Sequence, residues 1–202
     1  MLVKDNLTRK ERIELKATEL FREKGYAATS MRDLAAKLGM EAGSIYSHVR
    51  SKEEILQKIC FRMGNEFSEK LTEVENSNLS PIGKLKRIII EHTKVITKDI
   101  SASAVFWNEW KHLSKPFIDD FQLMKNTYEE KFIDIIDQSV KSKDFKKTDN
   151  KFTAMLILSA LNGIHQWYKP EGPMNPEEVG EQLSELLIGG IKKKLKHNNS
   201  KH

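Results

Sequence analysis

The feature that most constrains the fold is the stretch from Met31 to Val49, MRDLAAKLGMEAGSIYSHV. Its apolar residues recur at helical spacing, and Gly39 interrupts them where the chain needs a left-handed turn. Two helices joined by such a turn cross closely only over a small side chain, and Ala35 occupies that position. Ile45 is placed to anchor the second helix on the first. The spacing predicts a helix-turn-helix, although Ala-x3-Gly taken alone favours an ordinary helical hairpin.

Helical periodicity continues along the rest of the chain, so we predict an all-α fold. The 202 residues include only 10 Gly and 5 Pro, which favours long helices. Several helix starts are marked by a capping residue followed three positions later by an acid; these pairs are Thr8 and Glu11, Ser30 and Asp33, Ser51 and Glu54, and Asn175 and Glu178. The expected helices span about 8–24, 31–38, 42–48, 52–75, 81–99, 101–112, 116–142, 149–168 and 176–195.

Helix length divides the chain into two parts. The first three expected helices are short and closely spaced, while the others are long. We therefore expect an N-terminal three-helix domain with the helix-turn-helix at residues 1–51. Residues 52–202 are expected to form a larger C-terminal helical bundle for ligand binding and dimerisation.

Composition and missing motifs exclude several classes of protein. The net charge of +5 permits a nucleic-acid partner without establishing one. Because Cys60 is the single cysteine, no intrachain disulfide can form. The sequence shows neither a signal peptide nor an apolar run long enough to span a membrane, so we expect a cytoplasmic protein without membrane contact. The motifs of phosphate-binding loops, hydrolase elbows and zinc proteases are absent, so we expect no enzyme, no cofactor and no metal site. Glu109 and His112 share a helix face, but two ligands do not make a metal site.

The second helix of the motif carries the expected DNA-reading surface. Its outward positions, which would face a major groove, are Glu41, Ala42, Gly43, Ser44 and Ser47. Small and polar residues also surround both helix starts, where backbone amides bind phosphate well.

The stretch from Gly25 to Leu56, GYAATSMRDLAAKLGMEAGSIYSHVRSKEEIL, closely resembles the DNA-binding domain of the TetR (tetracycline-repressor) family. The resemblance implies that Glu41, Ala42, Ser44 and Ser47 face base edges. It also implies phosphate contacts by a second set, which is Thr29, Ser30, Tyr46, His48 and Lys52.

Two departures from the family's pattern concern the motif. Val49 stands where the family often has Phe, which should soften a core contact. The recognition helix is poor in Arg, Asn and Gln, the usual base readers, so specificity would rest on few direct contacts. DNA shape and an N-terminal arm with Lys4, Arg9 and Lys10 would then contribute.

Large rings gather in the middle of the chain, in the helices expected at 52–142. Each is individually more typical of a core than of a ligand contact, but together they suggest a cavity for an apolar ligand. The candidate lining residues are Phe67, His92, Phe106, Trp107, Trp110, Phe121 and Tyr128.

The expected helix at 149–168 is apolar nearly all round, which indicates burial on both faces. This fits either a monomer core or a two-fold four-helix interface. We favour the interface, because a helix-turn-helix monomer reads little DNA alone, and the TetR resemblance implies the same. The candidate interface residues are Leu161, Ile164, Trp167, Leu183 and Leu187.

The segment from Leu161 to Pro176, LNGIHQWYKPEGPMNP, resembles the C-terminal region of a TetR subgroup that regulates fatty-acid and steroid breakdown, whose effectors are acyl-CoA thioesters. These observations predict a repressor that binds a pseudo-palindromic double-stranded DNA operator as a homodimer. A small hydrophobic effector, with acyl-CoA or a fatty acid as the candidates, would release it. The alternative is a DNA-binding regulator without a small-molecule effector. The basic tail from Lys192 to His202 is either a solvated end or a nucleic-acid-binding arm.

Overall fold

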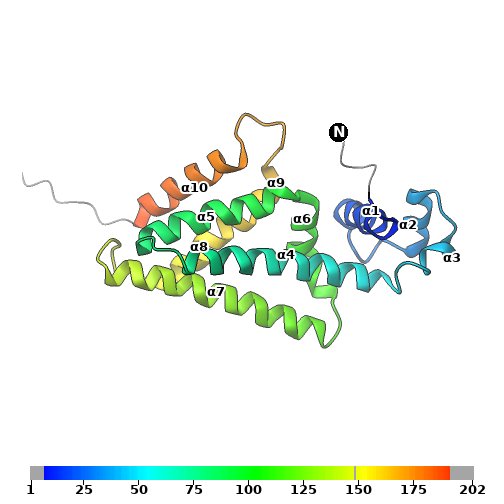
Figure 1. Cartoon of the computed structure of the whole chain (residues 1–202), viewed down its shortest axis with the longest axis horizontal. Helices are drawn as coiled ribbons and strands as arrows, with labels where there is room; N and C mark the ends of the chain where they lie inside the picture. The colour runs from blue at the N-terminus through cyan, green and yellow to red at the C-terminus, as the bar shows by residue number, and fades with distance from the viewer. Residues whose placement is uncertain (1–6, 148, 192–202) are drawn as a thin grey trace, which may run out of the picture.

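A computed structural model describes residues 7–147 and 149–191, and in these residues every regular element is a helix (Figure 1). The elements are α1 (Arg9–Lys24), α2 (Met31–Leu38), α3 (Ala42–Ile45), α4 (Lys52–Glu75), α5 (Pro81–Lys98), α6 (Ile100–Glu109), the 3-10 helix η2 (Trp110–His112), α7 (Phe117–Lys141), α8 (Asn150–Asn162), α9 (Ile164–Trp167) and α10 (Pro176–Ile191). The predicted all-α fold is confirmed.

The helix-turn-helix forms as its spacing predicts. Gly39 ends α2 in the left-handed conformation, with φ of 63° and ψ of 34°, which costs a glycine little. Ala35 is buried where α2 packs against its neighbours, and Ile45 is completely buried, so the four-residue α3 is anchored by one side chain. Three of the predicted capping boxes form in full, at Thr8, Ser30 and Asn175.

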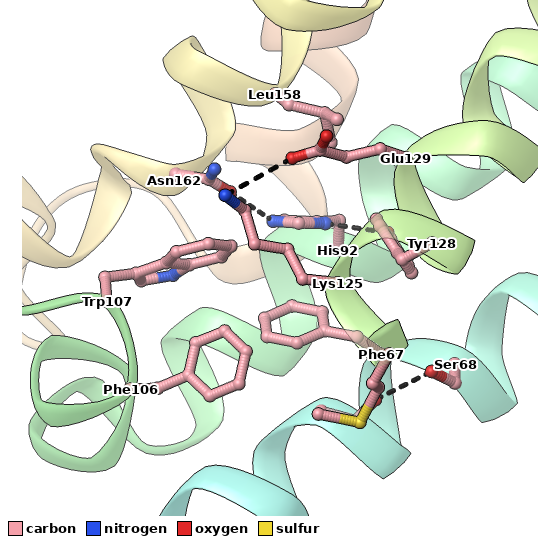
Figure 2. Close-up of a pocket in the computed structure, with 12 residues that line it drawn as sticks. Phe67, Ser68, His92, Phe106, Trp107, Lys125, Tyr128, Glu129, Leu158 and Asn162 are labelled. Carbon is pink, nitrogen blue, oxygen red and sulfur yellow. Dashed lines mark hydrogen bonds and ion pairs between the residues drawn. The ribbon is translucent and has the colours of Figure 1, made fainter. Parts of the chain in front are cut away.

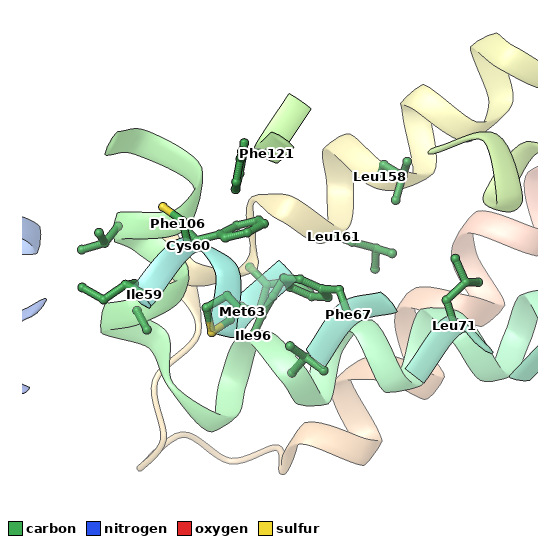
Figure 3. Close-up of a cluster of buried hydrophobic side chains, with 14 of the residues drawn as sticks. Ile59, Cys60, Met63, Phe67, Leu71, Ile96, Phe106, Phe121, Leu158 and Leu161 are labelled. Atoms are coloured by element: carbon green, nitrogen blue, oxygen red, sulfur yellow. The ribbon is translucent and has the colours of Figure 1, made fainter. Parts of the chain in front are cut away.

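The fourth helix connects the two ends of the molecule. Figure 1 shows α4 running from the α1–α3 unit into the bundle formed by α5, α7, α8 and α10. Its apolar face is buried along nearly its whole length, from Ile55 to Val74. Figure 3 shows this face meeting Phe106 and Phe121 at one end and Leu158 and Leu161 at the other. A movement of α4 would therefore displace side chains in both the α1–α3 unit and the bundle.

Three predicted helices end differently in the structure. The helix expected at 42–48 stops at Ile45 and continues as a turn, and the one expected at 101–112 finishes as the 3-10 helix η2. The helix expected at 149–168 breaks at Gly163 into α8 and α9. At this break the His165 Nδ1–H donates to the carbonyl oxygen of Asn162 over 2.6 Å, so that a side chain takes the place of a helical backbone donor.

Two expectations concern ends of the chain outside the described residues: the Lys4 part of the N-terminal arm and the tail from Lys192 onward. Within residues 7–147 and 149–191, no helix combines the length and apolar character needed to cross a membrane.

Candidate DNA-binding surface and ligand cavity

The outward face of α3 is open to solvent. Glu41, Gly43, Ser44 and Ser47 are exposed, and Ala42 is half-buried. The Ser47 hydroxyl donates to the carbonyl oxygen of Ser44 over 2.7 Å, which closes the turn after the helix. The geometry leaves short, mainly uncharged side chains available to base edges, so that the backbone can approach DNA closely.

Two of the residues expected at phosphates keep free side chains. Tyr46 is 56% exposed although it follows the fully buried Ile45. His48 is half-buried beside it. Ser30 is exposed, but its hydroxyl donates to the Asp33 carboxylate over 2.5 Å and accepts from the Asp33 amide as a helix cap. The Ser30 hydroxyl is therefore less available for a hydrogen bond to a phosphate than the sequence suggested.

Thr29 and Lys52 differ most from the expectation. Thr29 is 2% exposed, and its hydroxyl donates to the carbonyl oxygen of Gly25 over 2.8 Å, so its side chain cannot reach a phosphate. The Lys52 ammonium donates to the carbonyl oxygens of Tyr26 and Thr29, each over 2.7 Å, and lies 4.1 Å from the centre of the Tyr26 ring. Partial burial there lowers the Lys52 pKa. We conclude that Lys52 ties the start of α4 to the loop between α1 and α2.

Exposed cations near the motif were missed by the sequence analysis. Arg32 and Lys37 lie on α2 and Arg50 lies just after α3, and all three are exposed. Their positive charge suits the phosphate backbone beside a groove. The sequence does show these positive charges next to the motif. Helical periodicity alone does not say whether such a side chain lies on the DNA-binding side of the unit.

A small cavity lies inside the bundle, with a volume of about 30 Å³ (Figure 2). Helices α4, α5, α6, α7 and α8 all contribute to its wall. Five of the predicted lining residues meet there, namely Phe67, His92, Phe106, Trp107 and Tyr128. The lining residues that sequence reasoning missed are Gly64, Ser68, Met124, Lys125, Glu129, Leu158 and Asn162.

The remaining two predicted lining residues lie elsewhere. Trp110 lines a neighbouring outer groove of about 450 Å³ between α7, α8 and the end of α6. Phe121 is buried and lines neither space; its ring stacks on Trp110 with centroids 5.3 Å apart and packs edge-on against Phe106. Phe121 therefore supports the wall from behind, because its position on α7 turns it toward the core.

A buried histidine forms the polar centre of the cavity. The His92 Nδ1 is 2.8 Å from the Tyr128 hydroxyl oxygen and its Nε2 is 3.2 Å from the Asn162 Oδ1 (Figure 2). Because burial lowers the His92 pKa to about 3, the ring is neutral at physiological pH. An amide oxygen only accepts, so Nε2 carries the proton and Nδ1 accepts from Tyr128. Burial also raises the Tyr128 pKa, which keeps that hydroxyl protonated.

His92 gives the fold a measurable pH dependence. An unfolded histidine titrates near pH 6.5, whereas folded His92 stays neutral down to about pH 3. Its contribution to stability is present above pH 6.5 and is lost as the pH falls, because only the unfolded chain takes up the proton. We expect the free energy of unfolding, from urea denaturation at pH 4 to 6, to fall by about 1.4 kcal/mol per pH unit more in the wild type than in His92→Gln. Equal slopes would contradict the assignment.

The segment from α6 to the start of α7 joins the cavity to the helix-turn-helix unit. The Glu53 Oε1 accepts from the backbone N–H of Ser114 over 2.8 Å and from its hydroxyl over 2.5 Å, and these bonds lower the Glu53 pKa. The His112 ring stacks on Tyr26 with centroids 5.2 Å apart. Trp107 and Trp110, on the same segment, line the cavity and the groove. A shift at either tryptophan therefore has a short path to the DNA-binding end.

An apolar face remains uncovered at the other side of the bundle. Leu161 and Ile164, expected in a dimer interface, are completely buried and belong to the core of the chain. The same helix pattern instead exposes a different set of apolar side chains, which is Phe152, Met155 and Leu156 on α8, Trp167 on α9 and Leu186 on α10. Leu183 and Leu187 are half-buried beside them. The interface prediction is thus corrected for Leu161 and Ile164, because Leu161 continues the inward stripe of α8 and Ile164 packs into the core at the start of α9.

The described part of the chain contains no cluster of side chains that could bind a metal ion. Glu109 and His112 do approach, with 3.4 Å between Oε2 and Nε2. No third acid, histidine or cysteine joins them or any other pair in residues 7–147 and 149–191.

Two family models match the chain. Residues 15–59 match the model described as bacterial regulatory proteins of the tetR family, and residues 78–191 match the tetracyclin repressor-like C-terminal domain. The first covers the helix-turn-helix and the start of α4, and the second covers most of the bundle. The families describe transcriptional regulators rather than enzymes.

Individual proteins agree with the family models. The chain is 28% identical to the HTH-type transcriptional repressor KstR2 of Mycolicibacterium smegmatis over 185 residues, which is 91% of this chain and 90% of KstR2. It superposes on the structure of the ketosteroid transcriptional regulator KstR2 of Mycobacterium tuberculosis with a TM-score of 0.87 at 23% identity, covering 93% and 96% of the two chains. It also superposes on AibR, whose crystal structure is in complex with isovaleryl coenzyme A and operator DNA, with a TM-score of 0.76 at 22% identity, covering 92% and 98%. The motif, the bundle and both family models together place this chain in the tetR family of bacterial transcriptional regulators.

Proposed function

We propose that this regulator is a repressor that binds a pseudo-palindromic operator as a homodimer and is released by a small hydrophobic effector. The observation that carries the proposal is the arrangement of two sites on one chain. An exposed recognition helix lies at one end and an aromatic cavity lies in the bundle. Helices α4 and α6 line that cavity and also pack against α1 of the helix-turn-helix unit. Residues 1–51 would form the DNA-binding domain and residues 52–202 the effector-binding and dimerisation domain.

The assignment of DNA contacts follows the exposure of each side chain. We assign Ser44, Ser47, Glu41 and Ala42 to base edges, and Gly43 allows close approach of the backbone. Phosphate contacts are assigned to Tyr46, His48 and Ser30, together with the exposed cations of α2. Thr29 and Lys52 are assigned to holding the unit together.

Ser44 is the sharpest test of base reading, because it is exposed at the centre of α3. A hydroxyl that contacts a base edge contributes discrimination between sequences, of about 1–3 kcal/mol for a good bidentate contact and less for a single bond. Ser44→Ala is expected to change the sequences enriched by operator selection at one position in each half-site. Enrichment identical to that of the wild type would remove Ser44 from the base-reading set.

The effector class follows from the lining of the cavity. Aromatic and aliphatic side chains dominate the wall, with a few polar groups among them, as in sites for small apolar ligands. Acyl-CoA thioesters and fatty acids are the classes to test first, because the C-terminal segment resembles regulators with such effectors and AibR was crystallised with isovaleryl coenzyme A. A regulator without an effector is the alternative, and it would leave the cavity without a role.

Fluorescence anisotropy tests the proposal directly. A labelled operator duplex, obtained by selection on the purified protein, is titrated with protein and then with acyl-CoA thioesters and fatty acids of graded chain length. Coupling of about 1–3 kcal/mol would weaken operator binding 5- to 150-fold at saturating effector. If the operator affinity stays the same for every compound that binds the protein, the chain is not released by these effectors.

The contact between Glu53 and Ser114 is expected to carry part of this coupling. Glu53→Ala removes the acceptor for both Ser114 donors and frees the α6–α7 loop from the start of α4. We expect the fold-change in operator affinity caused by the effector to shrink several-fold, because the two sites lose one of their connections. Glu73→Ala is the matched control on the same helix, since within the described residues Glu73 pairs only with Lys70 one turn earlier. An undiminished response in Glu53→Ala would show that the contact between Glu53 and Ser114 carries no coupling.

A further inference from the structure

The inner cavity and the outer groove share five lining residues, which we call the neck: Trp107, Lys125, Glu129, Leu158 and Asn162. Inside the neck lies the aromatic cavity of about 30 Å³, and outside it lies the groove of about 450 Å³. A ligand that enters the cavity from the groove therefore passes these side chains. Their hydrogen-bonding capacity shows what the ligand must offer at this point.

The indole N–H of Trp107 is a hydrogen-bond donor that has no acceptor within the described residues. Its Nε1 is buried and makes no hydrogen bond to any residue in 7–147 or 149–191. The Phe106 ring stands perpendicular to the indole with centroids 4.7 Å apart, and an aromatic face is at best a weak acceptor. A buried donor without a partner costs free energy, and a ligand oxygen would recover it.

Asn162 and Lys125 add further donors to the lining of the neck. The Asn162 Oδ1 accepts from His92, which leaves its Nδ2 as a donor with no hydrogen bond inside the described part of the chain. The Lys125 Nζ lies 3.6 Å from the Glu129 carboxylate, and both side chains are about 40% exposed (dashed in Figure 2). An ion pair at that distance and exposure is weak, so Lys125 can turn to another oxygen. The neck thus offers three kinds of donor, and Glu129 is its main acceptor.

One wall of the inner cavity is the Met124 side chain, which occupies the space beside Gly64. A Cβ placed on Gly64 would lie 2.0 Å from the Met124 Cε, so the absence of a side chain on α4 is what admits Met124. Methionine is unbranched and adopts other rotamers easily, so its side chain can move aside when an apolar ligand binds. When Met124 swings away, the cavity gains the volume of its side chain.

We propose that the neck binds the acyl oxygen of an amphiphilic ligand, a carboxylate or a thioester carbonyl. The ligand's apolar chain then replaces the Met124 side chain between Gly64 and Phe106, and its polar remainder stays in the groove near Lys125 and Lys151. This inference rests on the proposed function only in treating the cavity as the effector site. It adds the chemical group that is recognised and the residues that recognise it.

The test compares hexanoyl-coenzyme A with S-hexyl-coenzyme A, a thioether that lacks only the carbonyl oxygen. Isothermal calorimetry on the full chain without DNA measures both affinities. We expect the thioester to bind about tenfold more tightly than the thioether in the wild type, as two recovered hydrogen bonds predict. The preference should fall to about twofold in Trp107→Phe and in Lys125→Met, which each remove a donor.

Trp167→Phe is the matched control, because it truncates an exposed indole on α9 that lines neither the cavity nor the groove. It is expected to keep the thioester-to-thioether ratio of the wild type, whatever the two affinities become. A wild-type ratio near one, or a ratio unchanged by Trp107→Phe and Lys125→Met, would overturn the proposal. Both variants alter side chains next to solvent-accessible space, and thermal unfolding confirms that they are folded.

Hexanoate separates the two sources of the acyl oxygen. Binding of hexanoate that weakens in Lys125→Met supports recognition of a carboxylate, whereas binding of hexanoyl-coenzyme A alone supports recognition of a thioester. Failure of both to bind the wild type overturns the proposal. Acyl-dependent binding that leaves operator affinity unchanged would instead uphold the neck and contradict release by effector, so the two failures are distinct.

Discussion

Ile45→Ala is expected to abolish specific operator binding and to lower the free energy of unfolding by about 2–5 kcal/mol. Ile45 is completely buried and is the only buried residue of α3. A helix of four residues has almost no stability of its own, so its position depends on packing, to which Ile45 contributes the one fully buried side chain of α3. Removing the side chain leaves a cavity between α2 and α3 and frees the recognition helix from the unit that orients it. Urea denaturation and anisotropy with the selected operator measure the two effects.

Tyr46→Ala separates stability from DNA contact. Tyr46 follows Ile45 in sequence but is 56% exposed, so its truncation should change the free energy of unfolding by less than about 0.5 kcal/mol. It should weaken binding to all DNA sequences, because a phosphate contact carries no sequence information. If Ile45→Ala unfolds at the same denaturant concentration as the wild type, the anchoring role assigned to Ile45 is wrong.

Leu156→Glu is expected to convert a dimer into a monomer and to weaken operator binding at least a hundredfold. Leu156 lies on the exposed apolar face of α8, beside Phe152 and Met155, and is about half exposed in the single chain. A carboxylate there is solvated in a monomer but would be buried and unpaired between two chains. When the dimer dissociates, the second half-site no longer benefits from the binding of the first, and linkage of this kind contributes 10²- to 10⁴-fold.

We propose that two chains pair through the exposed apolar side chains of α8, α9 and α10, and Leu123→Glu is the matched control. Leu123 is 67% exposed on α7 and belongs to none of these helices, so the same charge should leave the oligomeric state unchanged. Analytical ultracentrifugation measures the mass of each variant. A Leu156→Glu protein that sediments as the wild type does, and binds the operator equally well, would contradict the proposed interface.

Local patterns predicted the helix-turn-helix well. The capping boxes at Thr8 and Ser30, the left-handed turn at Gly39 and the anchor at Ile45 all form as predicted. Each depends on residues within about one helical turn of each other, or on a fixed spacing inside one motif. Backbone sterics and helix geometry decide such features, and these are properties of the sequence itself.

The phosphate contacts that the TetR resemblance implied for Lys52 and Thr29 depend on distant partners. The Lys52 ammonium donates to the carbonyl oxygen of Tyr26, 26 positions earlier, and Thr29, within the α1–α2 loop, is 2% exposed. A lysine at a helix start looks identical in sequence whether it points to solvent or to a neighbouring carbonyl. Only the packing of α4 against the α1–α2 loop separates the two.

The cavity shows which features the sequence predicts and which depend on tertiary packing. Its aromatic character could be predicted from Phe67, Phe106 and Trp107, because large rings gather in the helices expected at 52–142. Its polar centre could not, since His92 meets Tyr128 across 36 positions and Asn162 across 70. The sequence by itself determined the helices, their caps and the motif that reads DNA. The tertiary structure alone decided which polar groups face one another in the bundle, because such contacts depend on how whole helices pack and not on any spacing along one of them.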